Sequence, residues 1–202
     1  MTAPLDALRR YYDGRKPVLM GARHRFAVLC PLVERSGELH LLFEIRAAGL
    51  SQGGEVCFPG GHAEPGESAV DCALRETEEE LAIPPAEITL LGEMDFLYRR
   101  QSLVYPLVGL VSPAGLDAMR PSPDEVAEVF TVPLRFFQST PPEVYAYDLL
   151  PQVGEEFPYD AVGITRNYPW TREHIEVPIW HYEGHVIWGL TARIIRDLIS
   201  KL

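Results

Sequence analysis

The chain has 202 residues, of which 47% are hydrophobic and 23% are charged, and its formal net charge is −11. This length and apolar content fit one globular domain with its own core. The acidic balance argues against general nucleic-acid binding, which needs a basic surface, but leaves anionic small molecules open because a bound cation can outweigh net charge locally. No apolar run approaches the roughly 18–20 residues that span a bilayer. We therefore expect a soluble protein with no membrane partner.

Two features bear on the compartment. Cys30, Cys57 and Cys72 show no CxxC or CxxH spacing, so we expect mostly buried free thiols in a reducing, cytoplasmic environment. The chain ends in Ser200-Lys201-Leu202, which in eukaryotes is a peroxisomal address. The alternative is that these residues complete an amphipathic helix, where a lysine suits the negative end of the helix dipole.

The first half of the chain predicts a short helix, a hairpin and a strand. Residues 3–12 resemble a helix, and the β-rich runs 25–33 and 38–46 are separated by a turn that contains Gly37. Residues 54–61 form a short strand interrupted by Pro59 and two glycines, Gly60 and Gly61. Glycine there allows the backbone to approach a ligand closely.

The next helix has a well-marked start and end. Ser68 can cap it, with Asp71 three residues later, and Pro84-Pro85 terminates it. Its apolar side follows the helical period of 3.6 residues and consists of Val70, Ala73, Leu74, Thr77 and Leu81.

The second half predicts more strands and one further helix. Residues 87–98, 103–111, 125–134 and 144–150 read as strands, and residues 151–183, rich in proline and aromatic residues, have no clear assignment. A terminal helix is expected over about 186–201. With no clear linker, residues 1–202 form one mixed α/β domain in this interpretation.

Three glutamates of the central helix, Glu76, Glu79 and Glu80, share one face because they stand at i, i+3 and i+4. Like charges at this spacing each cost roughly 0.2–0.5 kcal/mol, so the face is either fully solvated or holds a cation. Clustered carboxylates without histidine or cysteine suit Mg²⁺ or Mn²⁺.

The surrounding spacing favours the cation. Gly61, Glu67, Arg75-Glu76, Glu79-Glu80 and Ile83 resemble the Nudix box, GX5EX7REUXEEXGU, in which U is a bulky aliphatic residue. Thr77 replaces the first U, and Ala82 replaces the last glycine.

This resemblance implies a fold and a reaction. The fold is an α/β/α sandwich with a mixed β-sheet, in which residues 61–83 form a loop–helix–loop. The reaction is metal-assisted hydrolysis of a diphosphate linked to another moiety. The implied metal ligands are Glu76, Glu79, Glu80 and the Gly61 carbonyl. Arg75 and Glu67 would form an ion pair that orients the glutamate face, and Glu125, preferred over Glu128, would be the base or an extra ligand.

A second resemblance narrows the substrate. Arg46, Gly54 and Phe58-Pro59-Gly60-Gly61 are similar to the motif of the coenzyme A diphosphatase branch, and the segment 185–198, with its IWGLTA stretch, resembles the end of that branch. The second arginine of the motif is absent, with Ser51 nearest. We therefore expect CoA or acyl-CoA as substrate, with Arg46, Phe58 and Gly60 in contact with it.

Other interpretations stay open at this point. Another nucleoside diphosphate derivative, such as ADP-ribose or NADH, could be the substrate, or the chain could bind a nucleotide without turnover. Trp170 and Trp180 could wall the pocket, although such residues are more often core. His62, His181 and His185 are expected in ordinary polar or surface roles. The partners are small molecules, and a homodimer is allowed.

Overall fold

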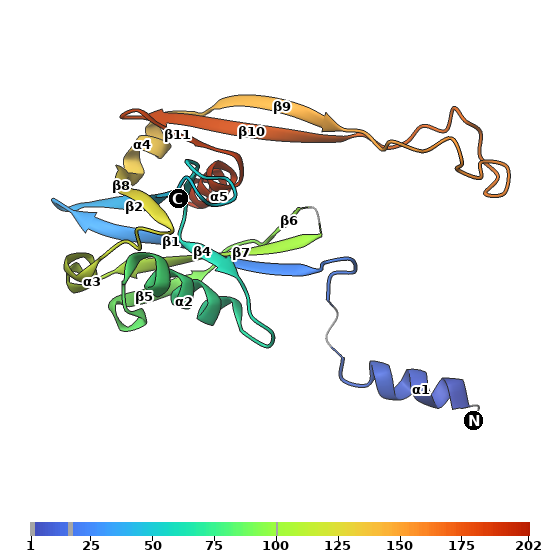
Figure 1. Ribbon diagram of the computed structural model, residues 1–202, viewed down its shortest axis with the longest axis horizontal. Helices are drawn as coiled ribbons and strands as arrows, with labels where there is room; N and C mark the ends of the chain where they lie inside the picture. The colour runs from blue at the N-terminus through green and yellow to red at the C-terminus, as the bar shows by residue number, and fades with distance from the viewer. Residues whose placement is uncertain (1–2, 16–17, 100) are drawn as a thin grey trace.

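The computed structural model describes residues 3–15, 18–99 and 101–202 (Figure 1). Helix α1 (Ala3–Tyr12) covers the range over which we expect the first helix, and it lies away from the main body of the protein. Among the described residues, no helix is both long enough and apolar enough to cross a membrane.

A mixed β-sheet forms the centre of the described part of the chain. Its strands are β1 (His24–Arg35), β2 (Glu38–Arg46), β3 (Val56–Cys57), β4 (Gly60–His62), β5 (Ile88–Glu93), β6 (Leu97–Arg99), β7 (Ser102–Val111) and β8 (Val126–Pro133). The order is β3-β2-β1-β7-β5, with β4 paired to β1, β6 to β7 and β8 to β2. Strands β1 and β7 are parallel, and the other pairs are antiparallel. The predicted mixed sheet is confirmed.

Helices cover both faces of this sheet, because the side chains of a strand alternate between faces. Ala27 and Leu29 of β1 pack with α2 (Ala69–Leu81) in one core cluster. Cys30 and Leu32 of the same strand belong to a second cluster with α5 (Gly189–Ile199). We call these sides the α2 face and the α5 face. The chain therefore has the expected α/β/α arrangement.

Ser68 caps the start of α2, as the sequence predicts. The hydroxyl of Ser68 accepts a 3.1 Å hydrogen bond from the backbone N–H of Asp71. At the other end Ala82 has φ 55°, a left-handed conformation that L-residues adopt at a cost. The box position that usually carries glycine thus keeps a glycine-like backbone here.

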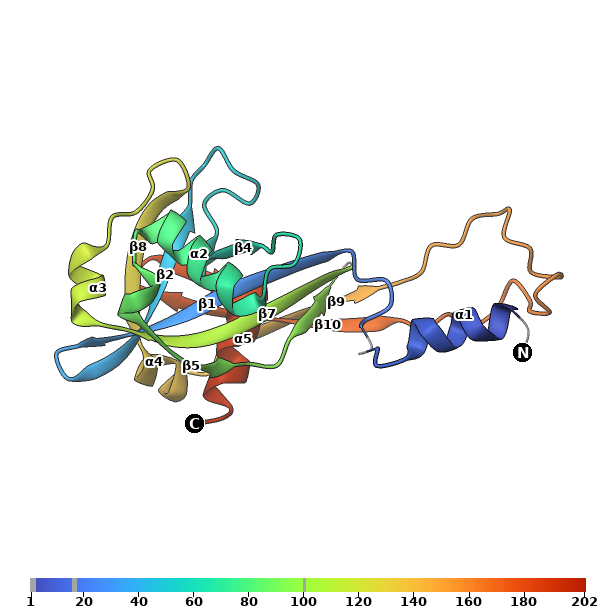
Figure 2. The same ribbon diagram turned by 90° about the horizontal axis from the view of Figure 1, so that it is seen from below.

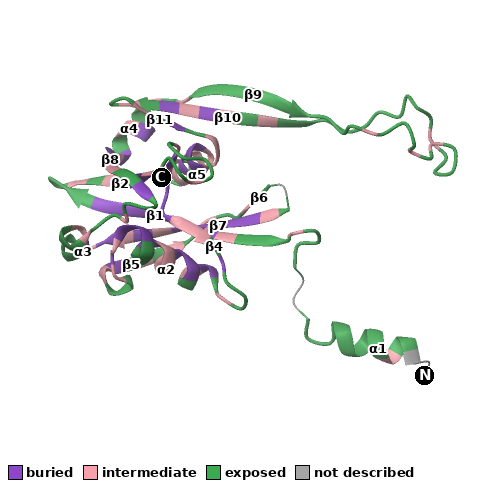
Figure 3. Ribbon diagram, viewed as in Figure 1, coloured by how far each residue is buried: buried purple, intermediate pink, exposed green. Residues whose placement is uncertain are grey.

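A separate three-stranded sheet projects from the body. It consists of β9 (Glu143–Leu149), β10 (Glu173–Tyr182) and β11 (His185–Trp188), in the order β11-β10-β9. Every residue of β9 is exposed, and the far loop extends well beyond the central sheet (Figures 1, 2 and 3). The near end is anchored by Trp180, which is 1% exposed and donates a 2.7 Å hydrogen bond to the Thr140 carbonyl.

Several boundaries differ from the sequence-based expectations. The run 87–98 divides into the short 3-10 helix η1 (Pro85–Glu87), β5 and β6, and two short helices, α3 (Pro113–Ala118) and α4 (Leu134–Ser139), were not predicted. The helix expected from 186 starts at Gly189, because residues 186–188 pair with β10 instead. Val186 and Ile187 are β-branched, which favours a strand, and Gly189 has φ 65°, which turns the chain.

Candidate active site

Two glycines bring β4 unusually close to its surroundings. Gly60 and Gly61 pair with Val28 and Ala27 of β1. A Cβ at Gly60, whose φ is 150°, would collide with the backbone of β1, and a Cβ at Gly61 would collide with the carboxylate of Glu76. Glycine is therefore required at Gly60, whereas at Gly61 the atoms in the way belong to the side chain of Glu76, which lies directly against the Gly61 backbone.

Glu80 is the most deeply buried of the box glutamates, with only 4% of its surface exposed. Its Oε2 accepts a 2.8 Å hydrogen bond from the backbone N–H of Gly60. Its Oε1 lies 4.0 Å from Nη1 of Arg46, whose Nε donates to the Ser51 carbonyl at 3.3 Å. Arg46 is thus at the edge of the glutamate cluster, where a phosphate contact is geometrically reasonable.

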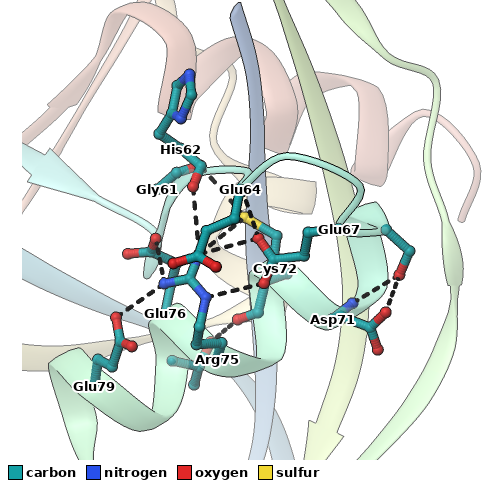
Figure 4. Close-up of polar contacts among 12 residues, drawn as sticks. Gly61, His62, Glu64, Glu67, Asp71, Cys72, Arg75, Glu76 and Glu79 are labelled. Carbon is teal, nitrogen blue, oxygen red and sulfur yellow. Dashed lines mark hydrogen bonds and ion pairs between the residues drawn. The ribbon is translucent and has the colours of Figure 1, made fainter.

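Arg75 gathers three of the acidic side chains of the box around one guanidinium (Figure 4). Its Nε lies 2.9 Å from Oε1 of Glu67, and its Nη1 lies 2.8 Å from Oε1 of Glu76 and 2.9 Å from Oε2 of Glu79. The hydrogen bonds from Arg75, followed by one from the Glu64 backbone N–H, lower the pKa of Glu67 to about 2. The structure contains the Arg75–Glu67 pair and extends it to Glu76 and Glu79.

The remaining acidic groups experience the opposite effect. Burial, opposed by the nearby Arg75, raises the pKa of Glu76. Burial also raises the pKa of Glu80, and the second cause is the charge of Glu44. Glu44 itself has a raised pKa, again mainly from burial. At these carboxylates burial therefore outweighs the nearby guanidinium groups of Arg75 and Arg46, unlike at Glu67.

Glu44 is a site residue that the sequence analysis missed. It lies in the middle of β2 and is 0% exposed. Its Oε1 accepts a 3.3 Å hydrogen bond from the Cys57 thiol, whereas its buried Oε2 has no partner in the part of the chain that the structure describes. The available signal was a single acidic residue inside the otherwise apolar run LLFEI.

The carboxylates of the box are chemically suited to a divalent cation, although their side chains do not converge on one point. Within the described ranges, no three histidine, cysteine or acidic side chains are close enough together to hold a metal ion. The reason is visible at Glu79, whose carboxylate is turned to Arg75. Buried carboxylates with raised pKa values and an unpartnered oxygen are nevertheless what a cation would stabilise. Glu76, Glu79, Glu80 and the Gly61 carbonyl could hold it.

The two candidates for a base lie in different places. Glu125 is exposed just before β8, and its charge contributes to the raised pKa values of Glu44 and Glu76, so it is within electrostatic reach of the cluster. Glu128 instead pairs at 3.0 Å with His185, whose ring stacks on Phe130 of the α5-face cluster. The geometry favours Glu125, whose role stays a prediction.

Some predicted contact residues lie elsewhere. Phe58 is 3% exposed and stacks on Phe43 in the α5-face cluster, so its ring is on the opposite side of the sheet from the glutamates. Trp180 is a core residue, and Trp170 lies in the loop of the projecting sheet. Among the histidines, His181 lies 3.9 Å from Glu143 on the hairpin, and the His62 carbonyl accepts a 3.3 Å hydrogen bond from Arg75.

Known sequences that are similar to this chain point to one family. The NUDIX domain family matches residues 23–153. The peroxisomal coenzyme A diphosphatase NUDT7 of Mus musculus is 37% identical over 137 residues, 66% of this chain but only 56% of that protein. The mitochondrial coenzyme A diphosphatase NUDT8 of Mus musculus is 32% identical over 180 residues, 87% of this chain and 76% of that protein. The Nudix hydrolase NudL of Photorhabdus laumondii is 35% identical over 178 residues, 87% and 83% of the two chains.

Two solved structures align with part of this chain at low sequence identity. The Nudix hydrolase RenU of M. smegmatis gives a TM-score of 0.49 at 20% identity, over 58% of this chain and 74% of that one. A binary complex of the C. elegans Ap4A hydrolase gives 0.47 at 20% identity, over 56% and 82%. The family match over more than half of the chain, joined to the box geometry on α2, shows that this chain belongs to the Nudix hydrolase family.

Proposed function

We propose that this protein hydrolyses the diphosphate bond of coenzyme A or an acyl-CoA, with Mg²⁺ or Mn²⁺, to 4′-phosphopantetheine (or its acyl form) and 3′,5′-ADP. The observation that carries the proposal is the acidic rim formed by Glu76, Glu79 and Glu80 on α2. In it Glu80 binds Gly60 and Glu76 lies against Gly61 of β4. Two of the relatives, matched at 37% and 32% identity, are named coenzyme A diphosphatases, which supports this choice of diphosphate.

Each residue of the rim has a role in this reaction. Glu76, Glu79 and Glu80 would hold the cation, which when bound neutralises charge on phosphoryl oxygens and lowers the pKa of a water molecule. Glu79 must leave Arg75 to do so, and its side chain is 55% exposed, so it is free to turn. Arg75 stays paired with Glu67 and keeps the helix face oriented.

Two further residues would act on the substrate. Arg46 lies at the edge of the cluster with part of its guanidinium exposed, and it would bind a phosphate. Glu125 would accept the proton of the attacking water, because it is exposed and close enough for its charge to affect Glu76.

The two stretches that resemble the coenzyme A branch are physically joined. The hydroxyl of Thr191, in the IWGLTA stretch, donates a 3.1 Å hydrogen bond to the carbonyl of Val56, just before the FPGG stretch. Thr191 is buried, and Val56 packs in the α5-face cluster. Their contact holds these two distant segments against each other.

The test is a substrate panel with product identification by mass spectrometry. Purified protein is incubated with CoA, acetyl-CoA, ADP-ribose or NADH, with Mg²⁺ or with EDTA. The proposal requires 3′,5′-ADP and 4′-phosphopantetheine from CoA only when the cation is present. Turnover of ADP-ribose or NADH with CoA untouched would assign another substrate, and binding without any turnover would indicate a nucleotide sensor. The compartment stays a prediction from the sequence, cytoplasmic with a peroxisomal alternative.

A further inference from the structure

A carboxylate outside the Nudix box lies beneath the acidic rim. Glu44 is on β2 two residues after Leu42, and the two point to the same face because strand residues two apart share a side. Arg46 follows an irregularity in the pairing of β2 with β8. Leu42 packs in the cluster under α2, and Arg46 reaches Glu80. Glu44 therefore faces α2 from the sheet, opposite the carboxylates that the helix contributes.

Two contacts of one short segment bring Glu44 and Glu80 near each other, because the Cys57 thiol donates to Glu44 and the backbone N–H of Gly60, three residues later, donates to Glu80. Among the neighbouring charges that act on Glu80, that of Glu44 is the strongest, ahead of Glu76 and Arg46. The nearest guanidinium, that of Arg46, is 4.0 Å from Glu80 and is also held by the Ser51 carbonyl. One partly exposed cation thus serves two buried carboxylates.

The hydrogen bonds of Glu44 leave half of its carboxylate unsatisfied. Its Oε1 has a weak donor, the Cys57 thiol, and its Oε2 is buried with no partner among the described residues. An ionised oxygen without a partner in the interior is costly. An apolar residue would suit this position as well as Leu42, which shares its face, so the strand itself gives no reason for an acid.

We propose that Glu44 is a ligand of the divalent cation, contributed by the sheet and closing the site from the side opposite α2. The proposal rests on the cation required by the proposed function. Its ligands would then come from β2, from β4 through Gly61 and from α2, which ties the helix to the sheet. Hard oxygen donors of this kind suit Mg²⁺ or Mn²⁺.

The experiment measures metal binding directly. Metal-free wild-type protein, Glu44→Gln and the control Glu78→Gln are titrated with Mn²⁺ by isothermal calorimetry. Glu78 is exposed on the same helix, so its variant has the same change of net charge away from the rim. We expect Glu44→Gln to lose about 10-fold or more in affinity, by analogy with the loss of residues that support a metal site, and Glu78→Gln to match the wild type. Equal affinity of Glu44→Gln and wild type would overturn the proposal.

A stability readout separates a ligand from a purely structural residue. If Glu44 binds the cation, the metal-free Glu44→Gln protein should melt at a higher temperature than the wild type, because a repulsive charge is gone, and Mg²⁺ should raise its melting temperature less. A structural acid would give the reverse, a lower melting temperature with an unchanged response to Mg²⁺.

A crystal of the wild-type protein grown with Mn²⁺ decides the matter if the variant does not fold. The anomalous peak of Mn²⁺ should lie within coordinating distance of Glu44 Oε2; a peak bound only by α2 residues would contradict the proposal.

The proposed function and the role of Glu44 would fail in different experiments. A wild-type protein that binds no Mn²⁺ removes the cation itself and with it the metal-dependent mechanism, whereas normal binding by Glu44→Gln removes only Glu44.

Discussion

The backbone N–H of Gly60 donates a 2.8 Å hydrogen bond to Oε2 of Glu80, which joins the start of β4 to the last turn of α2. The bond is possible because Gly60 lacks a Cβ and can lie against β1. One oxygen of Glu80 is thereby fixed in place, and the other faces Arg46 at 4.0 Å. A buried acid that is oriented by the backbone and faces other acids is prepared for a cation.

The pKa values of three buried carboxyls predict how the stability of the metal-free protein depends on pH. The folded-state pKa values of Glu76, Glu80 and Glu44 lie above the ordinary value of 4.5, so the folded protein binds more protons than the unfolded chain. The free energy of unfolding in EDTA should therefore fall as the pH rises from about 5 to about 8. Urea titrations across this range test the trend.

Added Mg²⁺ should reduce or reverse that trend, because it binds the ionised carboxylates in the folded state only. If the free energy of unfolding without metal stays constant or rises over this pH range, the pKa values of these carboxyls are not raised.

The Arg75–Glu67 pair gives a prediction of opposite sign. The folded-state pKa of Glu67, about 2, lies below its ordinary value of 4.5. The pair therefore stabilises the protein above pH 4.5, and this stabilisation is lost as the pH falls from 4.5 to about 2. NMR titration of the Glu67 carboxyl carbon measures this pKa. In Arg75→Lys the pKa should rise toward its ordinary value, because a lysine cannot reproduce the two-point contact of the guanidinium. A wild-type pKa near 4 would disprove the pairing.

Glu79 is the exposed member of the rim, so its replacement should affect turnover and not the fold. In Glu79→Gln we expect kcat for CoA to fall on the order of 10²-fold, with an unchanged melting temperature for the metal-free protein. Steady-state kinetics and thermal melts check both, and Glu78→Gln serves as the charge-matched control. Wild-type kinetics in Glu79→Gln would remove this residue from the metal site.

Ala82 predicts a gain in stability from one substitution. Its φ of 55° costs an L-residue about 1–2 kcal/mol, whereas glycine loses about 0.4–1 kcal/mol through the freer unfolded chain. Ala82→Gly should therefore raise the free energy of unfolding by about 0.5–1 kcal/mol, measured by urea denaturation. Ala73→Gly, the same replacement inside α2, should lower it. Destabilisation by Ala82→Gly would show that the left-handed cap is absent in solution.

The elements with strong local signals were predictable. The start of α2 follows from Ser68 and its face from the helical period, and both are present in the structure. The spacing also predicts that the three glutamates point outward together, opposite the apolar side; this is wrong for Glu80, which is buried and accepts a hydrogen bond from Gly60. The terminal helix is present, but its predicted start at about 186 is wrong, because residues 186–188 pair with β10, a strand that the sequence left unassigned.

Long-range relationships could not be read from the chain. Glu44 is separated by 36 residues from Glu80, and only the pairing of β1 with β2 and β4 brings it under the rim. For Phe58 the motif suggests a place in the site, because it stands beside Gly60 in the sequence. In the structure its ring instead lies on the α5 face of the sheet. In both residues the face of the sheet decides the role.

The rate of 3′,5′-ADP release from CoA, measured across Mn²⁺ concentrations for wild type, Glu80→Gln and Glu78→Gln, tests the central claim most directly. We predict that wild type and Glu78→Gln share one Mn²⁺ dependence, while Glu80→Gln needs about 10-fold more Mn²⁺ or stays inactive. Identical Mn²⁺ dependence in all three proteins, or CoA cleavage that persists in EDTA, would contradict the account.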